Sequence, residues 1–294
     1  MTYYVAKFFS RVFCLLPRSA AEFIGVILGE IFWLVVPKRR KTMARKNIMR
    51  CLNVGEDEAR RVAKKSVTRF GIMAIEVLRF PVMKKNLADY ILFVNEENIP
   101  ASMRYEGKGG VAITSHSGNW ELLGAALASL NVRTVAVGKK QKSSGADKFI
   151  TEYRELMDMH VTYKTGVREM FNLLKQGWAI GLLIDQDTDK RDGIIINFLG
   201  RPTNCVTGAA ALARYNDTPI LPMFLHRRDD GRHEAIIHRA LYVTKTKDKK
   251  ADIKQTTQEL NDIIAEHIRQ YPEEWFWLHD RWKSIREEWH LEEE

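Results

Sequence analysis

Residues 110–130 read GVAITSHSGNWELLGAALASL, and this stretch decides the fold. Its first part, residues 110–115, is an uncharged and mostly apolar run that predicts a buried strand. Residues 119–130 have a helical composition. Ser117-Gly118-Asn119 supplies the turn between the two, with Asn119 as the predicted helix cap. A buried strand that leads directly into a helix is the repeating unit of an α/β fold.

Strands and helices alternate on both sides of this stretch. Short apolar runs predict further strands at residues 132–137, 178–184, 194–198, 220–225 and 234–243. Helical patterns predict helices at residues 55–80, 146–158, 168–176, 206–215 and 260–271. Strands that alternate with helices favour an α/β fold with a mostly parallel central sheet, covered by helices on both faces.

The overall composition narrows the class of protein. The 294 residues are 45% hydrophobic and 28% charged, which excludes a disordered or fibrous chain and allows a large core. Three cysteines, Cys14, Cys51 and Cys205, are far apart and lack the spacing of metal ligands. We therefore expect neither a disulfide framework nor a structural zinc site, and the cysteines fit a reducing compartment.

The positive charge of the chain is concentrated at its N-terminus. The formal net charge is +9, and residues 1–50 contain ten basic and two acidic residues, a net of +8. The other 244 residues contain 36 basic and 35 acidic residues. A nucleic-acid-binding protein usually carries its basic excess on the folded domain. This distribution instead favours an anionic membrane surface as the partner.

The same fifty residues contain the most apolar stretches. Residues 5–16 place apolar side chains on one helix face and basic ones on the other, the pattern of a helix that lies in a membrane interface. A second apolar run, residues 20–36, contains Glu22 and Glu30. We expect this run to be embedded or shallowly inserted, because a membrane span needs about 20 consecutive apolar residues. The alternative is two core helices of a soluble domain, followed by a solvated run of charges.

These observations predict two parts. Residues 1–50 form a basic and apolar helical segment that associates with a membrane, and residues 51–294 form the α/β domain. We find no internal repeat and no linker long enough to divide the second part.

His116 stands directly after the predicted strand, and Glu121 lies in the first turn of the following helix. In α/β sheets, functional sites form where strands end in loops that lead into helices. The turn can bring Glu121 against His116, where a carboxylate would fix the tautomer of one ring nitrogen and leave the other as a general base. We therefore predict that both residues are catalytic. The alternative is that His116 caps the helix and Glu121 compensates its dipole.

Further motifs occur in order along the chain. They are Asn47-Ile48 after the basic run, Arg168, LLKQG at 173–177, DQD at 185–187, NFLGRP at 197–202, TGA at 207–209, PILP at 219–222 and EWFWLHDRWK at 274–283. Together with the His-x4-Glu spacing of His116 and Glu121, this ordered set resembles the lipid A biosynthesis (late, Kdo-lipid A) acyltransferases, within the glycerolipid-type acyltransferase superfamily. The resemblance covers nearly the whole chain.

The resemblance implies a specific reaction. A fatty acyl chain would be transferred from an acyl-carrier-protein thioester to a hydroxyl of a lipid A precursor, at the cytoplasmic face of a bacterial inner membrane. His116 would take the proton of the acceptor hydroxyl, and Glu121 would orient His116 and stabilise its protonated form. No acyl-enzyme is required, and neither a metal nor an organic cofactor is implied.

Seven residues are predicted to bind substrate or to line its site. They are Asn119, Lys139, Lys140, Arg168, Asp185, Asp187 and Arg191. The four cations are candidates for contacts with phosphate or phosphopantetheine, because guanidinium and ammonium groups bind phosphate. Ordinary surface charges are the alternative. The two aspartates follow the predicted strand 178–184, and we favour a site-lining or structural role for them.

Two other functions stay open at this stage. Asp185 and Asp187 would hold a metal and a nucleotide sugar if the chain were a membrane glycosyltransferase. The chain would otherwise be a non-catalytic peripheral protein that binds lipid A precursors or a carrier protein.

Overall fold

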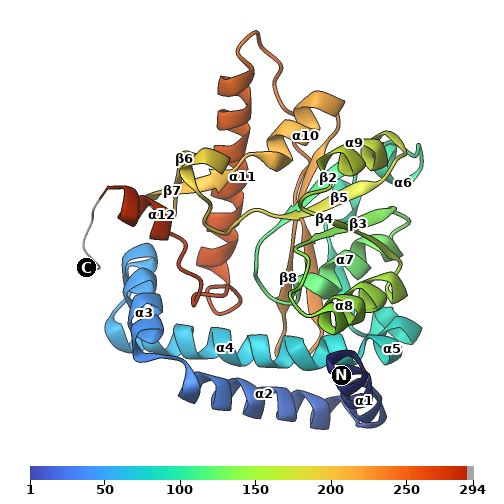
Figure 1. The fold of residues 1–294 in the computed structure, drawn as a ribbon, viewed down its shortest axis with the longest axis vertical. Coiled ribbons are helices and arrows are strands. Elements are labelled where there is room, and N and C mark those ends of the chain that lie inside the picture. Colours follow the sequence, from blue (N-terminus) through green and yellow to red (C-terminus); the bar gives the residue numbers. More distant parts are fainter. Residues whose placement is uncertain (290–294) are drawn as a thin grey trace.

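The computed structural model describes residues 1–289, and its centre is a seven-stranded sheet (Figure 1). In spatial order the strands are β1 (Ile91–Val94), β9 (His233–Ile237), β8 (Ile220–Arg227), β2 (Gly110–Thr114), β5 (Ala179–Leu183), β3 (Thr134–Gly138) and β4 (Met159–Tyr163). Neighbouring strands run parallel, with the exception of the antiparallel pair β8 and β9. The predicted mostly parallel sheet is therefore confirmed.

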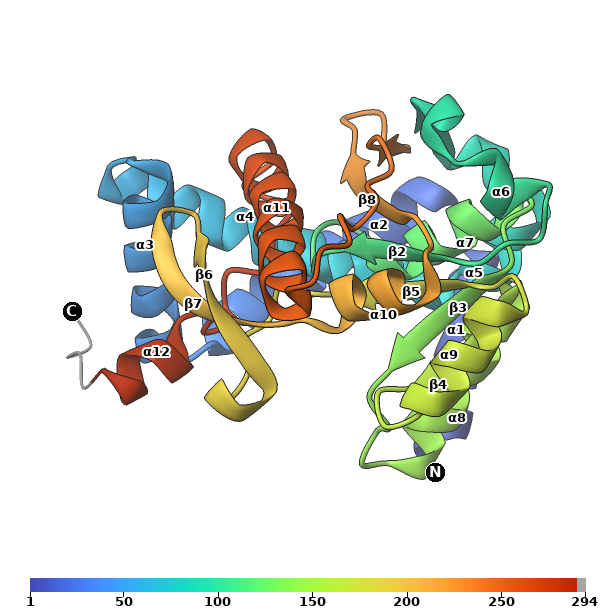
Figure 2. The same ribbon diagram turned by 90° about the horizontal axis from the view of Figure 1, so that it is seen from above.

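Helices cover both faces of the sheet (Figures 1 and 2). Those next to it are α7 (Trp120–Ser129), α8 (Ser144–Leu156), α9 (Val167–Lys175), α10 (Gly208–Asn216) and α11 (Lys249–Gln270). Because successive strand residues point to opposite faces, Val111 and Ile113 of β2 share a core with α9, α10 and α11, whereas Ala112 shares one with α7 and α8. The prediction of helices on both faces is confirmed.

Three strands have no clear signal in the sequence: β1, β4 and β7 (Arg201–Val206). At the sheet edge, β4 contains His160 and Thr162 and therefore lacks a continuous apolar run. β7 begins with Arg201-Pro202, and it pairs with β6 (Gly193–Phe198) in a separate two-stranded antiparallel sheet. The short helices are α5 (Phe80–Met83), α6 (Ala101–Arg104) and α12 (Lys283–Glu288), and the 3-10 helices span Lys84–Asp89, Glu96–Asn98 and Lys190–Asp192.

The N-terminal part is helical, as predicted, and packs against the rest of the chain. It comprises α1 (Thr2–Leu15), α2 (Arg18–Val35) and α3 (Lys38–Leu52), followed by α4 (Glu56–Leu78). In Figure 1, α2 and α4 run side by side below the sheet. Their backbones approach closely at Gly25, Gly29 and Gly71: a Cβ atom on Gly71 would lie 2.5 Å from the carbonyl oxygen of Gly25. The domain boundary at residue 50 stays a prediction.

Helices α1 and α2 expose many large apolar side chains. On α1 these are Tyr4, Val5, Phe8, Phe9, Val12 and Leu15, and on α2 they are Phe23, Ile27, Leu28, Ile31, Phe32, Leu34 and Val35. We call this set the N-terminal apolar surface. Within residues 1–289 no helix alone has the length and apolar character of a membrane span; α2 and α3 have them only as a pair, which bends by 105° at the break.

Candidate active site

His116 and Asp185 form a hydrogen-bonded pair at the ends of two neighbouring strands. Asp185 Oδ1 lies 2.8 Å from His116 Nδ1, and Asp185 Oδ2 accepts the backbone N–H of His116 at 2.9 Å. The side chain of His116 is 23% exposed and that of Asp185 only 2%. One ring nitrogen is thus bound to a buried carboxylate, and Nε2 is the nitrogen left for chemistry.

The parallel register of β2 and β5 explains this pair. Thr114 of β2 lies opposite Leu183 of β5, and both functional side chains follow two residues later. The sequence predicts that His116 and Asp185 each follow a strand. It does not reveal that β5 lies beside β2, because β3 and β4 separate them along the chain.

This geometry corrects the expectation that Glu121 orients His116. Glu121 accepts two hydrogen bonds from the guanidinium of Arg154 on α8, at 2.8 and 2.7 Å. Only 13% of the Glu121 side chain and 17% of the Arg154 side chain are exposed. The buried bidentate pair holds the Glu121 carboxylate toward α8, and Asp185 takes the position on the His116 ring. Arg154 gave no signal in the sequence, because α8 follows a different strand.

Gly118 and Asn119 fix the turn between β2 and α7. Gly118 has a φ of +58°, and a Cβ atom there would lie 2.0 Å from the carbonyl oxygen of Leu225, so only glycine fits. Asn119 Oδ1 accepts the N–H of Leu122 at 3.0 Å, which confirms the predicted helix cap. Its Nδ2 donates to Glu76 at 2.8 Å. Because Asn119 is buried and bonded at both ends of its amide, this geometry gives it a structural role and does not support the predicted substrate contact.

The Asp185 carboxylate is held in its charged form. Burial acts to raise its pKa, but the His116 ring, the Trp275 indole and the His116 backbone N–H together hold the pKa well below its ordinary value. The indole donates to Oδ2 at 2.7 Å. A carboxylate on Nδ1 keeps the hydrogen on that nitrogen and stabilises the protonated ring. Nε2 then carries a lone pair and can act as a general base.

Gln186 and Trp120 flank the His116 ring. The side-chain nitrogen of Gln186 lies 3.2 Å from His116 Nε2. The Trp120 ring centre lies 5.0 Å from that of His116, in an edge-on arrangement. Trp120 also lines an apolar pocket, which therefore lies next to the His116–Asp185 pair.

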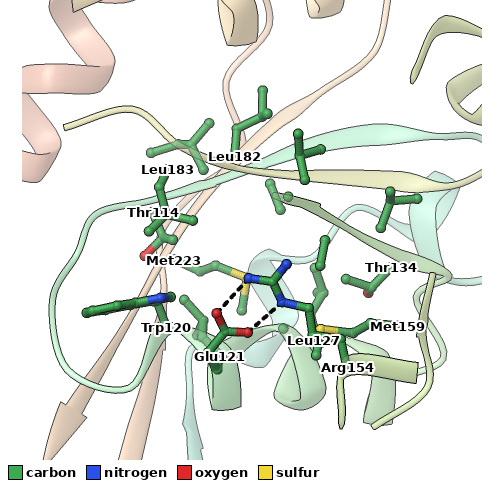
Figure 3. Close-up of a pocket in the computed structure, with 18 residues that line it drawn as sticks. Thr114, Trp120, Glu121, Leu127, Thr134, Arg154, Met159, Leu182, Leu183 and Met223 are labelled. Atoms are coloured by element: carbon green, nitrogen blue, oxygen red, sulfur yellow. Dashed lines mark hydrogen bonds and ion pairs between the residues drawn. The ribbon is translucent and has the colours of Figure 1, made fainter. Parts of the chain in front are cut away.

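The pocket lies between α7 and strands β2, β3 and β5. Figure 3 shows Trp120 on one side of the lining and Met159 on the other, with the Glu121–Arg154 pair between them. Gly124 and Gly181, which lack side chains, are part of the wall. Most of the other lining residues are aliphatic, so the character of the lining suits an apolar group.

Three of the four predicted cations lie at the edge of the sheet where His116 and Asp185 follow their strands. Lys139 and Lys140 are exposed directly after β3, and Arg168 is exposed at the start of α9, which follows β4. Because β2, β5, β3 and β4 are parallel, their C-terminal ends share one edge. Arg191 is exposed in the turn before β6. Their contacts with phosphate groups stay predictions.

Asp187 is bound to the C-terminal part of the chain. Its carboxylate accepts hydrogen bonds from the backbone N–H and the hydroxyl of Ser284, at 2.8 and 2.7 Å, and its own N–H donates to His279 Nε2 at 3.0 Å. Burial raises the pKa of Asp187. Asp185 and Asp187 therefore have separate protein partners. Across residues 1–289, no three His, Cys, Asp or Glu side chains are grouped to hold a metal ion.

Comparison with known proteins decides the family. Residues 1–284 match the model of the bacterial lipid A biosynthesis acyltransferases. The chain belongs to this family. Membership confirms the resemblance seen in the ordered motifs, and it makes the chain an acyltransferase. The glycosyltransferase and the non-catalytic binding protein are thereby set aside.

Individual proteins that are similar to this chain in sequence are also acyltransferases. Phosphatidylinositol mannoside acyltransferase of Mycobacterium tuberculosis is 27% identical over 226 residues, which cover 74% of this chain and 69% of that protein. Lipid A biosynthesis lauroyltransferase of Escherichia coli is 22% identical over 272 residues, covering 92% and 87%. Among solved structures, 1-acyl-sn-glycerophosphate acyltransferase from Thermotoga maritima matches 80% of this chain and 96% of its own, with a TM-score of 0.41 and 12% identity.

Proposed function

We propose that this acyltransferase moves a fatty acyl chain from an acyl-carrier-protein thioester to a hydroxyl of a lipid A precursor, at the cytoplasmic face of a bacterial inner membrane. The observation that carries the proposal is the His116–Asp185 pair beside an apolar pocket, in a chain of the lipid A acyltransferase family. The pair supplies a base for the hydroxyl, and the pocket supplies a site for the acyl chain.

In the proposed mechanism, His116 Nε2 takes the proton of the acceptor hydroxyl as the oxygen attacks the thioester carbon. The tetrahedral intermediate then forms the ester and breaks the C–S bond, and the protonated ring returns its proton to the leaving thiolate. Asp185 holds the hydrogen on Nδ1 and stabilises the imidazolium between the two steps. The acceptor hydroxyl takes the place beside Nε2 that the Gln186 side chain occupies at 3.2 Å.

The donor is proposed to approach along the edge where the strands end. Lys139, Lys140 and Arg168 are exposed on this edge. Cations in this position favour the approach of an acidic carrier protein and of the phosphate on its phosphopantetheine arm. The acyl chain would then enter the pocket next to Trp120, with its thioester beside His116.

A transfer assay with defined donors and acceptors tests the proposal. We expect the purified protein in detergent to move radiolabelled acyl chains from acyl-carrier protein to a Kdo-bearing lipid A precursor. Because one relative is a phosphatidylinositol mannoside acyltransferase, the acceptor panel includes that glycolipid. Acyl-coenzyme A is the second donor.

Each arm of this assay has a defined meaning. Product on the mannoside alone would replace the lipid A acceptor, and product from acyl-coenzyme A alone would replace the carrier-protein donor. If no donor and acceptor pair gives a labelled product, the proposed reaction is wrong.

The proposed reaction needs access to a lipid acceptor, and the N-terminal apolar surface is the proposed contact with the bilayer. Its side chains lie on α1 and α2, and in Figure 1 both helices are on the outside of the molecule, below the sheet. The basic helix α3 follows directly, with Lys38, Arg40 and Lys46 exposed. Apolar side chains beside cations are typical of proteins that bind an anionic membrane surface.

Two aromatic residues of this surface give a direct test. Phe8 and Phe23 are 62% and 65% exposed, so their replacement leaves the core intact. We expect the double variant Phe8→Ser/Phe23→Ser to float with vesicles of anionic phospholipid several times less than the unchanged protein. The control is Tyr215→Ser, at an aromatic residue of α10 that is 60% exposed. Equal flotation of the double variant and the unchanged protein would contradict the membrane contact.

A further inference from the structure

Residues 272–284, which follow α11, run across the turn that carries His116. We call them the C-terminal strap. The N–H of Gly118 donates to the carbonyl of Glu274 at 3.0 Å, and the N–H of Phe276 donates to the carbonyl of His116 at 3.1 Å. Ser117 and Trp275 form an isolated antiparallel bridge between these two bonds. The backbone of His116 is therefore held by the strap as well as by β2.

The strap also reaches the carboxylate behind the imidazole. The Trp275 indole N–H donates to Asp185 Oδ2 at 2.7 Å. Trp275 is 1% exposed and Asp185 2%, so water does not replace this donor. The Trp275 ring is held in place by ring contacts with Trp277, Phe198 and Trp282, whose centres lie 4.6, 5.8 and 6.4 Å away.

Apart from His116, Trp275 is thus the one side chain that the described residues place on Asp185 by a hydrogen bond. The other donors to this carboxylate, the ring and the backbone N–H, both belong to His116. A buried carboxylate that loses a donor becomes easier to protonate and freer to rotate. After either change, the carboxylate would hold the His116 ring less firmly in its orientation.

We propose that Trp275, in the C-terminal strap, is a positioning residue. Its indole N–H keeps the Asp185 carboxylate oriented toward His116, the base of the reaction. This inference rests on the proposed function, because it concerns the base of that reaction. It predicts that acyl transfer depends on the indole N–H itself and not only on the bulk of the ring.

The pH dependence of transfer reports this role. Asp185 faces His116 from the β2–α7 turn, and at longer range it faces Cys205 of β7 and His279 and Arg281 of the strap. Cys205, His279 and Arg281 change little when the indole is removed, because their own hydrogen bonds stay in place. Loss of the Trp275 donor makes the carboxylate more basic, so the His116–Asp185 pair takes up its first proton at a higher pH. The acid limb of kcat/KM therefore moves to higher pH.

Trp275→Phe and Trp277→Phe form a matched pair of variants. Both tryptophans are 1% exposed and lie in the strap, but the Trp277 indole donates to the carbonyl of Pro272 at 2.7 Å. We expect Trp275→Phe to lower kcat about ten- to hundredfold, with little change in the KM for donor, and to move the acid limb to higher pH. Trp277→Phe should leave the acid limb in place.

A third variant separates the N–H from the packing. Trp275→3-benzothienylalanine keeps the shape of the two fused rings and replaces the N–H with sulfur, so it should show the same lower kcat and the same shift as Trp275→Phe. An unchanged acid limb in this variant would overturn the inference, as would equal behaviour of the two Phe variants. Full activity of His116→Ala in the same assay would instead overturn the proposed function.

Discussion

The His116→Ala variant is expected to lose acyl transfer by roughly 10³-fold or more, with its fold and its flotation with vesicles unchanged. A positioned general base contributes roughly 10²- to 10⁴-fold to rate. Among the described histidines, His116 is the one that is bound to a buried carboxylate beside Trp120 of the apolar pocket. Because 23% of the His116 side chain is exposed, the space that its removal opens is in contact with solvent. The initial rate of radiolabelled transfer from acyl-carrier protein is the measurement.

His160→Ala is the matched control for this variant. His160 lies in β4, its side chain is 41% exposed, and its Nε2 is 3.6 Å from a carboxylate oxygen of Glu169. It therefore also belongs to an imidazole–carboxylate pair, but one on the edge strand of the sheet, where 51% of the Glu169 side chain is exposed. We expect its transfer rate to stay within about threefold of the unchanged enzyme. Equal rates for His116→Ala and His160→Ala would remove His116 from the chemistry.

The sequence is sufficient to place His116 in the turn after a buried strand, because the signals that position it are local. The apolar run 110–115 predicts the strand, and Gly118 and Asn119 predict the turn and the cap. The structure contains each of these features, including the positive φ at Gly118 and the cap bond from Asn119. A motif whose parts are neighbours in the chain can be recognised without knowledge of the rest of the fold.

The partner of His116 could not be found in the same way. Asp185 reaches it because β5 lies beside β2, and the order of strands in a parallel sheet depends on packing between distant segments. Trp275 comes from a still later segment that has no regular secondary structure. Glu121 has the spacing expected of a partner, but Arg154 on α8 binds it through two charged hydrogen bonds. The spacing of Glu121 from His116 in the sequence does not indicate that Arg154 binds Glu121.

Asp185→Asn is expected to lower kcat by roughly 10³-fold while the thermal midpoint changes little. The amide has the size of the carboxylate, but it is neutral and no longer stabilises the imidazolium or selects the required tautomer. Trp275 and the backbone N–H of His116 donate to the same oxygen, Oδ2, and an amide oxygen in its place keeps both bonds. The KM for the acyl donor should stay near its original value, because Asp185 does not line the pocket.

Glu121→Gln is the informative comparison, because it makes the same chemical change at the other candidate acid. It leaves the Arg154 side chain, which is 17% exposed, without its bidentate carboxylate partner in the wall of the pocket. We therefore expect a lower thermal midpoint and a higher KM for the acyl donor, with a kcat at least tenfold above that of Asp185→Asn. If Glu121→Gln instead matched the kcat of Asp185→Asn at an unchanged thermal midpoint, Glu121 and not Asp185 would be the residue that orients His116. The Asp185 carboxylate would then be a structural acceptor for the strap, since its contacts with Trp275 and the His116 backbone would be its remaining function.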